Sequence, residues 1–313
     1  MSTSYQNTLL RSATHKGVGV HSGKTATVTL YPAPFSHGIV FKRTDVQTPA
    51  IIPASFKHIA STNYHTTLQS IHTQDTLATV EHLMAALWAL SVDNVLITVD
   101  GPEIPILDGS ARPWMNLIQE SGLVKQKGVA QTTPSLIKVT RDIRVQHQES
   151  WLQISPSHTF SVTMTVPLEE GLLHTHTYRQ GDSFYQDISS ARTFSRRTHI
   201  EHMKQMGLIK GGSLDNALVL ENGKPLNPEG FRGENECARH KILDLVGDWA
   251  LAGHAFLGHV EGYASGHTLN YQLLKKLLES DFAAQKPMQQ AIESVSLVVN
   301  KQAGTAMPAH PSF

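Results

Sequence analysis

A helical segment with a polar stripe constrains this chain more than any other feature. Residues 239–249 read RHKILDLVGDW. At about 3.6 residues per turn, His240, Asp244 and Asp248 fall on one face of that helix, while apolar side chains cover the other faces and require burial. An imidazole and a carboxylate four residues apart can bind one metal ion, and zinc accepts both ligand types. The spacing alone also fits a solvent-exposed face with local salt links, which is the commoner arrangement.

The composition limits the partners and compartments open to the chain. Its 313 residues and 40% hydrophobic content are enough for two cores of ordinary size. The 26 basic and 26 acidic side chains cancel, so no overall field favours nucleic acid. The sequence has no signal peptide pattern and no apolar run approaching about eighteen residues, which predicts a cytoplasmic protein without a membrane span. The single Cys237 excludes an intrachain disulfide and is expected to be a small core residue.

Two parts of the chain show the same predicted order of elements. Each part has a helix, a strand, a turn and a second helix. The helices and strands are expected over residues 79–90, 93–100 and 110–118, and again over 239–252, 254–263 and 269–278. His82 and His240 occupy the same place in the two parts, 158 positions apart (240 minus 82). This pattern predicts an internal duplication whose equivalent helices face each other.

A polar stretch of low periodicity separates the two parts and predicts the domain boundaries. Residues 125–134 are the best linker candidate. The expected domains are 1–126, which carries Glu81 and His82, and 135–282, which carries the polar stripe. Residues 283–313, rich in Gln, Pro and Ala, are expected to form a flexible tail.

The helix expected at 79–90 supplies the second half of a candidate metal site. Its Glu81 and His82 lie among apolar residues, where polar groups are costly unless something compensates them. His82, His240 and Asp244 would give three protein ligands and leave one position open for water, as in catalytic rather than structural zinc sites. On these residues alone, a zinc hydrolase and an arrangement without metal both stay open.

Several motifs in fixed order resemble one enzyme family. They are TVEHL at 79–83, PEIPILDGS at 102–110, ARTF at 191–194, GGS at 211–213, RHKILD at 239–244 with GD at 247–248, and SGH at 265–267. Together they resemble the UDP-3-O-acyl-N-acetylglucosamine deacetylases of lipid A biosynthesis, from about residue 7 to about residue 280. The resemblance implies an α+β fold of two α/β sandwich domains of similar topology, each with an insert, and a zinc site at the domain interface.

The resemblance also implies a metal centre and a base. His82, His240 and Asp244 match the zinc ligands of the family, and Glu81 matches its general base. Zinc lowers the pKa of bound water to about 7, so Glu81 would only have to accept a proton from water that is already acidified.

Four further residues match the groups that stabilise charge and supply a proton. His267 would protonate the leaving amine, and Asp248 would orient it. Thr193 and Lys241 would help to hold the oxyanion. A neighbouring carboxylate should raise the pKa of His267 and keep its charged form available at neutral pH.

Contacts to the rest of the substrate follow only from the resemblance. An insert near 195–220 matches the passage for the acyl chain. The matching substrate-binding residues are Phe194, Phe160, Ile200, Met203, Ile209, Gly212 and Leu214. Without the resemblance, the same apolar segment predicts a small βαβ packing cluster. Arg192, Arg196 and Arg197 could contact a diphosphate, whereas Ala264 stands where the family often has a lysine.

The sequence therefore predicts a zinc-dependent deacetylase that removes acetate from UDP-3-O-(3-hydroxyacyl)-N-acetylglucosamine. It would be a cytoplasmic monomer whose partner is this acylated UDP-amino sugar. One alternative is a zinc hydrolase of another amide or amino sugar, although the HExxH pattern of common zinc peptidases is absent. Another is a lipid- or nucleotide-binding module with a structural metal, against which Glu81 beside an open metal position argues.

Overall fold

The structure is a computed structural model, and it describes residues 4–129, 135–279 and 283–287. Its helices are α1 (Glu81–Ala89), α2 (Arg112–Ser121), α3 (Phe184–Asp187), α4 (Arg197–Gln205), α5 (Glu236–Ala250) and α6 (His267–Leu278), with short 3-10 turns at Phe56–His58 and Glu169–Gly171. The four helices predicted from apolar periodicity are confirmed as α1, α2, α5 and α6, with ends that differ by a few residues.

The first large sheet joins strands from the first half of the chain. In spatial order they are β2 (Ala13–Val18), β3 (Thr25–Pro32), β9 (Val95–Val99), β4 (Ile39–Arg43) and β5 (Ala50–Pro53). Among these described strands, β4 and β9 are parallel and the other neighbouring pairs are antiparallel. Buried residues alternate with more exposed ones along β3 and β9, so one face of the sheet packs against the core.

The second large sheet repeats this arrangement with strands from the second half. Its corresponding strands are β12 (Ile143–His147), β13 (Ser150–Ser155), β19 (Ala255–Tyr263), β14 (Phe160–Pro167) and β15 (Leu173–Arg179). Again the third and fourth strands, β19 and β14, are parallel, and the other pairs are antiparallel. In each sheet the central strand follows one helix and precedes another in sequence. The predicted internal duplication is therefore confirmed, strand by strand.

In each half, the first strand and the last strand also pair with each other. These strands are β1 (Ser4–Leu9) with β10 (Leu123–Gly128), and β11 (Ser135–Val139) with β20 (Ala283–Pro287), both antiparallel. Thr8 in β1 bridges Asn94, just before β9, in parallel fashion, and β11 pairs with β19 in the same sense. The duplication thus extends to the outer strands.

This pairing corrects two sequence expectations. Residues 125–128, assigned to a linker, belong to β10, and residues 283–287, assigned to a tail, form β20. Strand β10 is polar and mostly exposed, so it lacks the alternation that marks a half-buried strand, and backbone hydrogen bonds to β1 define it instead. Residues 130–134 and 288–313, the rest of the expected linker and tail, lie outside the described residues. The exact domain limits stay a prediction.

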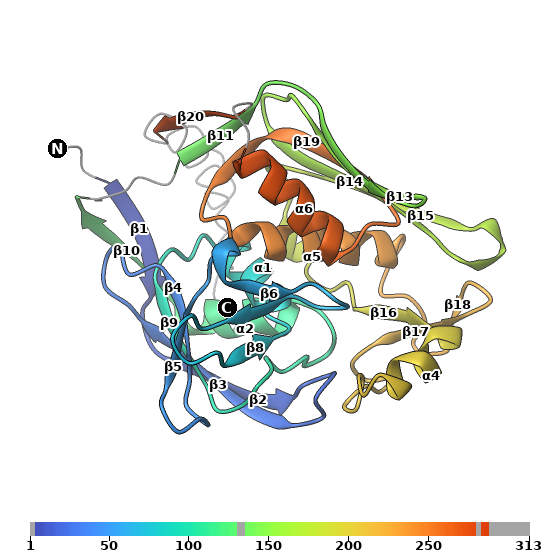
Figure 1. Cartoon of the computed structure of the whole chain (residues 1–313), viewed down its shortest axis with the longest axis horizontal. Helices are drawn as coiled ribbons and strands as arrows, with labels where there is room; N and C mark the ends of the chain where they lie inside the picture. Colours follow the sequence, from blue (N-terminus) through green and yellow to red (C-terminus); the bar gives the residue numbers. More distant parts are fainter. Residues whose placement is uncertain (1–3, 130–134, 280–282, 288–313) are drawn as a thin grey trace, which may run out of the picture.

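Each half carries an additional small sheet. The strands are β6 (Ile59–Ser61), β7 (Thr67–Gln69) and β8 (Thr76–Ala78) in the first half, and β16 (Phe194–Arg196), β17 (Leu218–Glu221) and β18 (Lys224–Pro225) in the second. Helix α4 connects the parallel strands β16 and β17. The segment around 195–220 is therefore a small βαβ unit, and it lies at the edge of the molecule (Figure 1).

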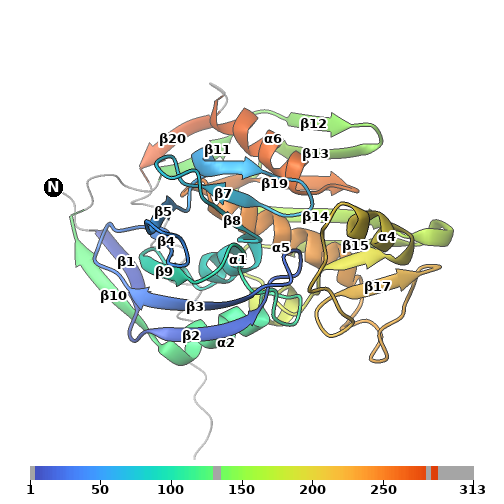
Figure 2. The ribbon, with the colours of Figure 1, turned by 60° about the horizontal axis from the view of Figure 1, so that its bottom comes forward.

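The helices of the two halves face each other between the large sheets. In Figure 2, β2 and β3 lie below and β13 and β19 lie above, with α1 and α5 between them. Every residue of α1 from Glu81 to Leu87 is buried. At the crossing, a Cβ atom added to Gly247 of α5 would lie only 2.1 Å from the backbone oxygen of Glu81. Glycine at this position lets α5 approach the first turn of α1.

The N-terminus of α1 has no side-chain cap. The residue before the helix is Val80, which makes no side-chain cap, and Thr79 has a positive φ of 59°. The Thr79 hydroxyl donates instead to Oε1 of the buried Glu103 at 3.0 Å. The carboxylate of Glu81 occupies the first turn, where the helix dipole favours negative charge.

Two further expectations concern membranes and cysteine. No helix within the described residues combines the length and the apolar character that crossing a membrane requires. Cys237 is fully buried, and burial raises the pKa of its thiol to about 12. The expectation of a small core residue is confirmed.

Candidate active site

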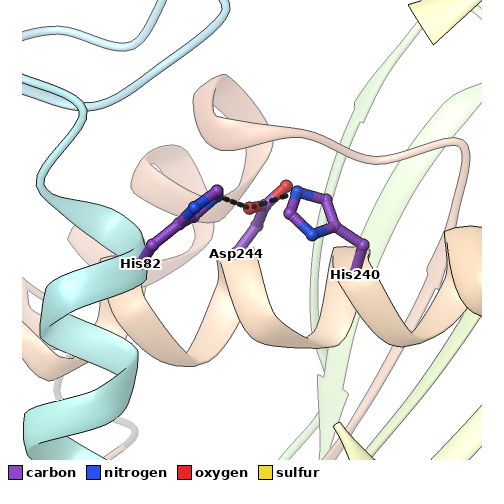
Figure 3. A group of neighbouring side chains, drawn as sticks. All are labelled: His82, His240 and Asp244. Carbon is purple, nitrogen blue, oxygen red and sulfur yellow. Dashed lines mark ion pairs between the residues drawn. The ribbon is translucent and has the colours of Figure 1, made fainter. Parts of the chain in front are cut away.

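The crossing of α1 and α5 brings together the three predicted metal ligands. Figure 3 shows His82 from α1 opposite His240 and Asp244, one turn apart on α5. Asp244 Oδ1 lies 3.2 Å from His240 Nε2 and 3.7 Å from His82 Nε2. The candidate ligand atoms all lie within 4.8 Å of one another, and the three residues are at most 4% exposed. The polar stripe is therefore buried, and the alternative of a solvent-exposed face is wrong.

The protonation of His240 indicates why these groups fit a cation. His240 Nδ1 lies 3.0 Å from the carbonyl oxygen of Ala191, which only accepts, so Nδ1 carries the proton. Burial, opposed only partly by Asp244, lowers the pKa of His240 to about 3, and Nε2 of the neutral ring keeps a lone pair. That lone pair faces Asp244 Oδ1, a buried oxygen that accepts no hydrogen bond from the described residues. Two lone pairs that face each other without a proton between them repel, and a divalent metal ion bound to both atoms would remove this repulsion.

Lys241 adds a positive charge at the second oxygen of Asp244. Its Nζ lies 2.6 Å from Asp244 Oδ2, and its side chain is 20% exposed. Burial alone would raise the pKa of Asp244, but His240 and Lys241 outweigh it and hold this pKa well below its usual range. Asp244 is therefore ionised.

Glu81 and His267 form a buried pair next to the candidate ligands. Glu81 Oε1 lies 3.7 Å from His267 Nε2, and the two residues are 3% and 8% exposed. Burial raises the pKa of Glu81 to about 7, although His267 and His82 oppose the shift. Burial alone would lower the pKa of His267, but Asp248 and Asp244 raise it to about 9. At neutral pH one group can accept a proton and the other can donate one.

Asp248 holds His267 within a hydrogen-bond network that the sequence predicted only in part. Asp248 Oδ2 accepts from His267 Nδ1 and from Asn270 Nδ2, each at 2.8 Å, and Oδ1 accepts from the Thr66 hydroxyl at 2.6 Å. Asn270 lies three residues after His267 on α6, so helical spacing could have identified it. Nothing in the sequence around Thr66 indicates its contact with Asp248.

The ARTF segment lies beside the candidate ligands. Ala191 contacts His240 as described, and the Phe194 ring centroid lies 6.2 Å from that of His240. Thr193, which precedes Phe194 in the sequence, is partly exposed, and its backbone N–H donates to the backbone oxygen of Gly109 at 2.7 Å. This bond ties the second half of the chain to the PEIPILDGS segment of the first.

The residues matched to substrate contacts do not form one continuous group. Met203 is 8% exposed, Ile200 and Ile209 are half-buried, and Gly212 and Leu214 are exposed on the βαβ unit. Phe160 lies elsewhere, in the core of the second half, where its ring centroid is 6.1 Å from that of Trp88.

The proposed diphosphate contact of Arg192 is wrong. Arg192 is fully buried, its Nε donates to Glu236 Oε1 at 2.8 Å, and its Nη1 pairs with Glu229. A guanidinium inside the protein needs such carboxylates, and they leave it no free face for a ligand. Arg196 donates to the oxygen of Pro167, and the exposed Arg197 pairs with Glu221.

Two half-buried histidines of the first half lie together. The ring centroids of His21 and His65 are 4.4 Å apart. Burial lowers the pKa of both, that of His65 to about 4, so both are neutral at pH 7. The backbone N–H of His21 donates to Glu103, whose second oxygen accepts from the N–H of Ser22.

Comparisons with known proteins identify the family of this chain. A family model described as UDP-3-O-acyl N-acetylglycosamine deacetylase matches residues 6–279. A protein of Myxococcus xanthus named UDP-3-O-acyl-N-acetylglucosamine deacetylase is 41% identical over 276 residues, which cover 87% of this chain and 86% of that protein. Proteins with the same name from Syntrophotalea carbinolica and Legionella pneumophila are each 40% identical, over 88% and 84% of this chain and 88% and 86% of their own lengths. This chain therefore belongs to the UDP-3-O-acyl N-acetylglycosamine deacetylase family.

Proposed function

We propose that this protein hydrolyses the N-acetyl group of UDP-3-O-(3-hydroxyacyl)-N-acetylglucosamine, releasing acetate, in lipid A biosynthesis. The observation that carries the proposal is the buried group of His82, His240 and Asp244 beside the Glu81–His267 pair, in a chain of this family. Zinc is the metal we propose, because two imidazoles and one carboxylate suit it and leave a position open. When bound, zinc supplies Lewis-acid polarisation of the amide carbonyl and acidifies water.

The side chains around the metal group would carry the proton transfers. Glu81, with a pKa raised to about 7 by burial, would accept the proton of the attacking water. His267 keeps its proton at neutral pH, because Asp248 and Asp244 outweigh its burial and raise its pKa to about 9. It would donate this proton to the amine as the C–N bond breaks, leaving acetate and a free amino sugar.

Two further groups would stabilise the oxyanion that develops on the amide carbonyl. Thr193 is held beside the candidate ligands by its backbone bond to Gly109. Lys241, whose Nζ lies 2.6 Å from Asp244 Oδ2, would contribute a second donor. The functional assignments of both residues rest on the family resemblance together with this placement.

The βαβ unit is the proposed contact for the acyl chain. Ile209 is half-buried on this unit, and Leu214 is 41% exposed. Phe194, Ile200, Met203 and Gly212 would complete the contact, and Phe160 would contribute from the second sheet. We further propose that the protein acts as a monomer and that it works in the cytoplasm. The single buried cysteine fits a reducing compartment such as the cytoplasm.

The decisive experiment measures acetate release from the acylated sugar nucleotide. The purified protein should release acetate when it contains zinc, lose that activity after chelation and regain it when zinc is restored. Metal analysis of the active preparation should give about one zinc per chain, in keeping with one site of three ligands. A zinc-loaded protein that leaves this substrate intact but cleaves another amide would support the alternative hydrolase instead.

A further inference from the structure

Thr66 uses all of its polar groups inside the candidate site. It lies just before β7 in the first half of the chain and is 1% exposed. Its backbone oxygen accepts from the N–H of Val80 at 3.4 Å, and its own N–H donates to Glu81 Oε2 at 3.2 Å. Its hydroxyl donates to Asp248 Oδ1 at 2.6 Å. A single residue therefore contacts both the proposed base and the carboxylate that holds the proposed acid.

The direction of the hydroxyl bond follows from its neighbours. Asp248 Oδ2 accepts from His267 Nδ1, so that ring nitrogen carries a proton and cannot accept one from Thr66, 3.5 Å away. The Thr66 hydroxyl must therefore donate to the Asp248 carboxylate.

The contact also crosses between the two halves of the chain. The other hydrogen-bond donors to Asp248 among the described residues, His267 and Asn270, both come from α6 in the second half. Thr66 comes from the first half, as does Glu81. Without the Thr66 hydroxyl, the Asp248 carboxylate would accept hydrogen bonds only from its own half among the described residues, while the base would stay in the other half.

We propose that Thr66 is a positioning residue that sets the separation of Glu81 and His267 through its hydroxyl bond to Asp248. This inference rests on the proposed deacetylase function, in which those two groups exchange protons with the substrate. Their facing atoms are 3.7 Å apart, and a displacement of about 1 Å in such a site can reduce the rate by roughly 10². The backbone bond from Thr66 to Glu81 survives side-chain substitution, so loss of the hydroxyl releases the acid side alone.

A second contact between the two halves of the chain provides a matched control. The Thr62 and Thr268 hydroxyls lie 3.1 Å apart, and Thr268 Oγ1 also donates to the oxygen of Thr62 at 3.3 Å. This pair joins the loop before β7 to the start of α6, whereas the Thr66 hydroxyl reaches Asp248 on α5. The pair is exposed and touches no carboxylate of the site. Thr62→Val therefore removes one hydroxyl contact between the halves, the one to Thr268 Oγ1, without touching Asp248.

The test compares Thr66→Val, Thr66→Ser and Thr62→Val in the full-length, zinc-loaded protein. Thr66→Val should lower kcat by roughly 10- to 100-fold while KM, zinc content and far-UV circular dichroism stay near the wild type. Thr66→Ser, which keeps the hydroxyl, should stay within about threefold of wild-type kcat, and so should Thr62→Val. In an Asp248→Asn background, Thr66→Val should cause little further loss, because coupled residues are not additive.

The outcomes separate this inference from the proposed function. If the wild type releases no acetate, the proposed function fails and the inference fails with it. If the wild type is active and Thr66→Val keeps its kcat, or Thr66→Ser is as impaired as Thr66→Val, only the inference is overturned. Should Thr66→Val not fold, Thr66→Ala carries the same expectation, because it removes the hydroxyl without adding a second methyl group.

Discussion

His267 Nε2 lies 3.7 Å from Glu81 Oε1, although the two residues begin helices in different halves of a duplicated fold. Neither half contains the complete site. The first half supplies Glu81, His82 and Thr66, and the second supplies the groups on α5 and α6. The proposed catalytic arrangement therefore depends on how tightly α1 and α5 pack, and the predictions below test both the chemistry and this packing.

Removal of a candidate ligand should remove the metal. His82→Ala or Asp244→Ala should sharply reduce bound zinc and acetate release together, because two protein ligands bind a metal more weakly than three. Zinc per chain, measured after dialysis against a weak chelator, gives the result. Retention of one zinc at wild-type affinity in both variants would refute the ligand assignment.

Glu81 and His267 should affect the rate without affecting the metal. Glu81→Gln should keep zinc and fold but lower kcat by roughly 10² to 10⁴, because the attacking water loses its proton acceptor. His267→Ala should cause a loss of similar size from the acid side. Zinc analysis is the control here. If Glu81→Gln lost its zinc, Glu81 would be a ligand, and if His267→Ala kept wild-type kcat/KM, another group would have to be the acid.

The pH dependence of kcat/KM should be bell-shaped. Burial raises the pKa of Glu81 to about 7, so activity should fall as the pH drops through that region and the base becomes protonated. Burial alone would lower the pKa of His267, but Asp248 and Asp244 raise it to about 9. Activity should therefore fall again as the pH rises through that value, because the acid loses its proton. Zinc-bound water would titrate together with Glu81 and His267, so the apparent pKa values of the two limbs of the profile would belong to these coupled groups and not to single residues. In His267→Ala the basic limb should change; an unchanged limb would argue against His267 as the acid.

The βαβ unit should influence the acyl chain. Activity on a UDP-N-acetylglucosamine without the 3-O-acyl group should fall by orders of magnitude, because binding energy from the chain positions the reacting amide. Replacement of the exposed Leu214 by Trp should shift the preferred chain length with little change in stability. Met203, which is 8% exposed on the same unit, offers a contrast, since Met203→Trp should mainly destabilise the fold. An unchanged chain-length preference in Leu214→Trp would indicate that this side chain only packs against the protein.

Gly247 tests the helix crossing itself. In the middle of a helix, Gly→Ala ordinarily stabilises a protein by roughly 0.5 to 1 kcal/mol. Here the added Cβ would lie 2.1 Å from the oxygen of Glu81, so Gly247→Ala should lower the free energy of unfolding and separate α1 from α5. Denaturant unfolding and kcat measure the two effects. A stabilised variant with wild-type kcat would show that the helices can separate without consequence for the site.

The sequence predicted the main elements and their repetition because those signals are local. Apolar periodicity marks α1 and α5, and the same element order occurs twice, which indicated a duplication that strand order confirms. It was wrong about β10 and β20, whose positions depend on backbone pairing with β1 and β11 at the far ends of each half. A polar strand held by a distant partner has no pattern of its own to recognise.

The candidate site divides in the same way. Motifs in fixed order were sufficient to select His82, His240, Asp244, Glu81 and His267, and helical spacing alone placed Asp248 on the stripe with two of them. Only the tertiary structure decided that the stripe is buried, that Thr66 joins the base to the carboxylate behind His267, and that Arg192 pairs with Glu236 inside the protein. Spacing along a helix determines which side chains share a face. Which polar groups meet across two halves depends on how closely their helices approach, and here a single glycine at the crossing permits that approach.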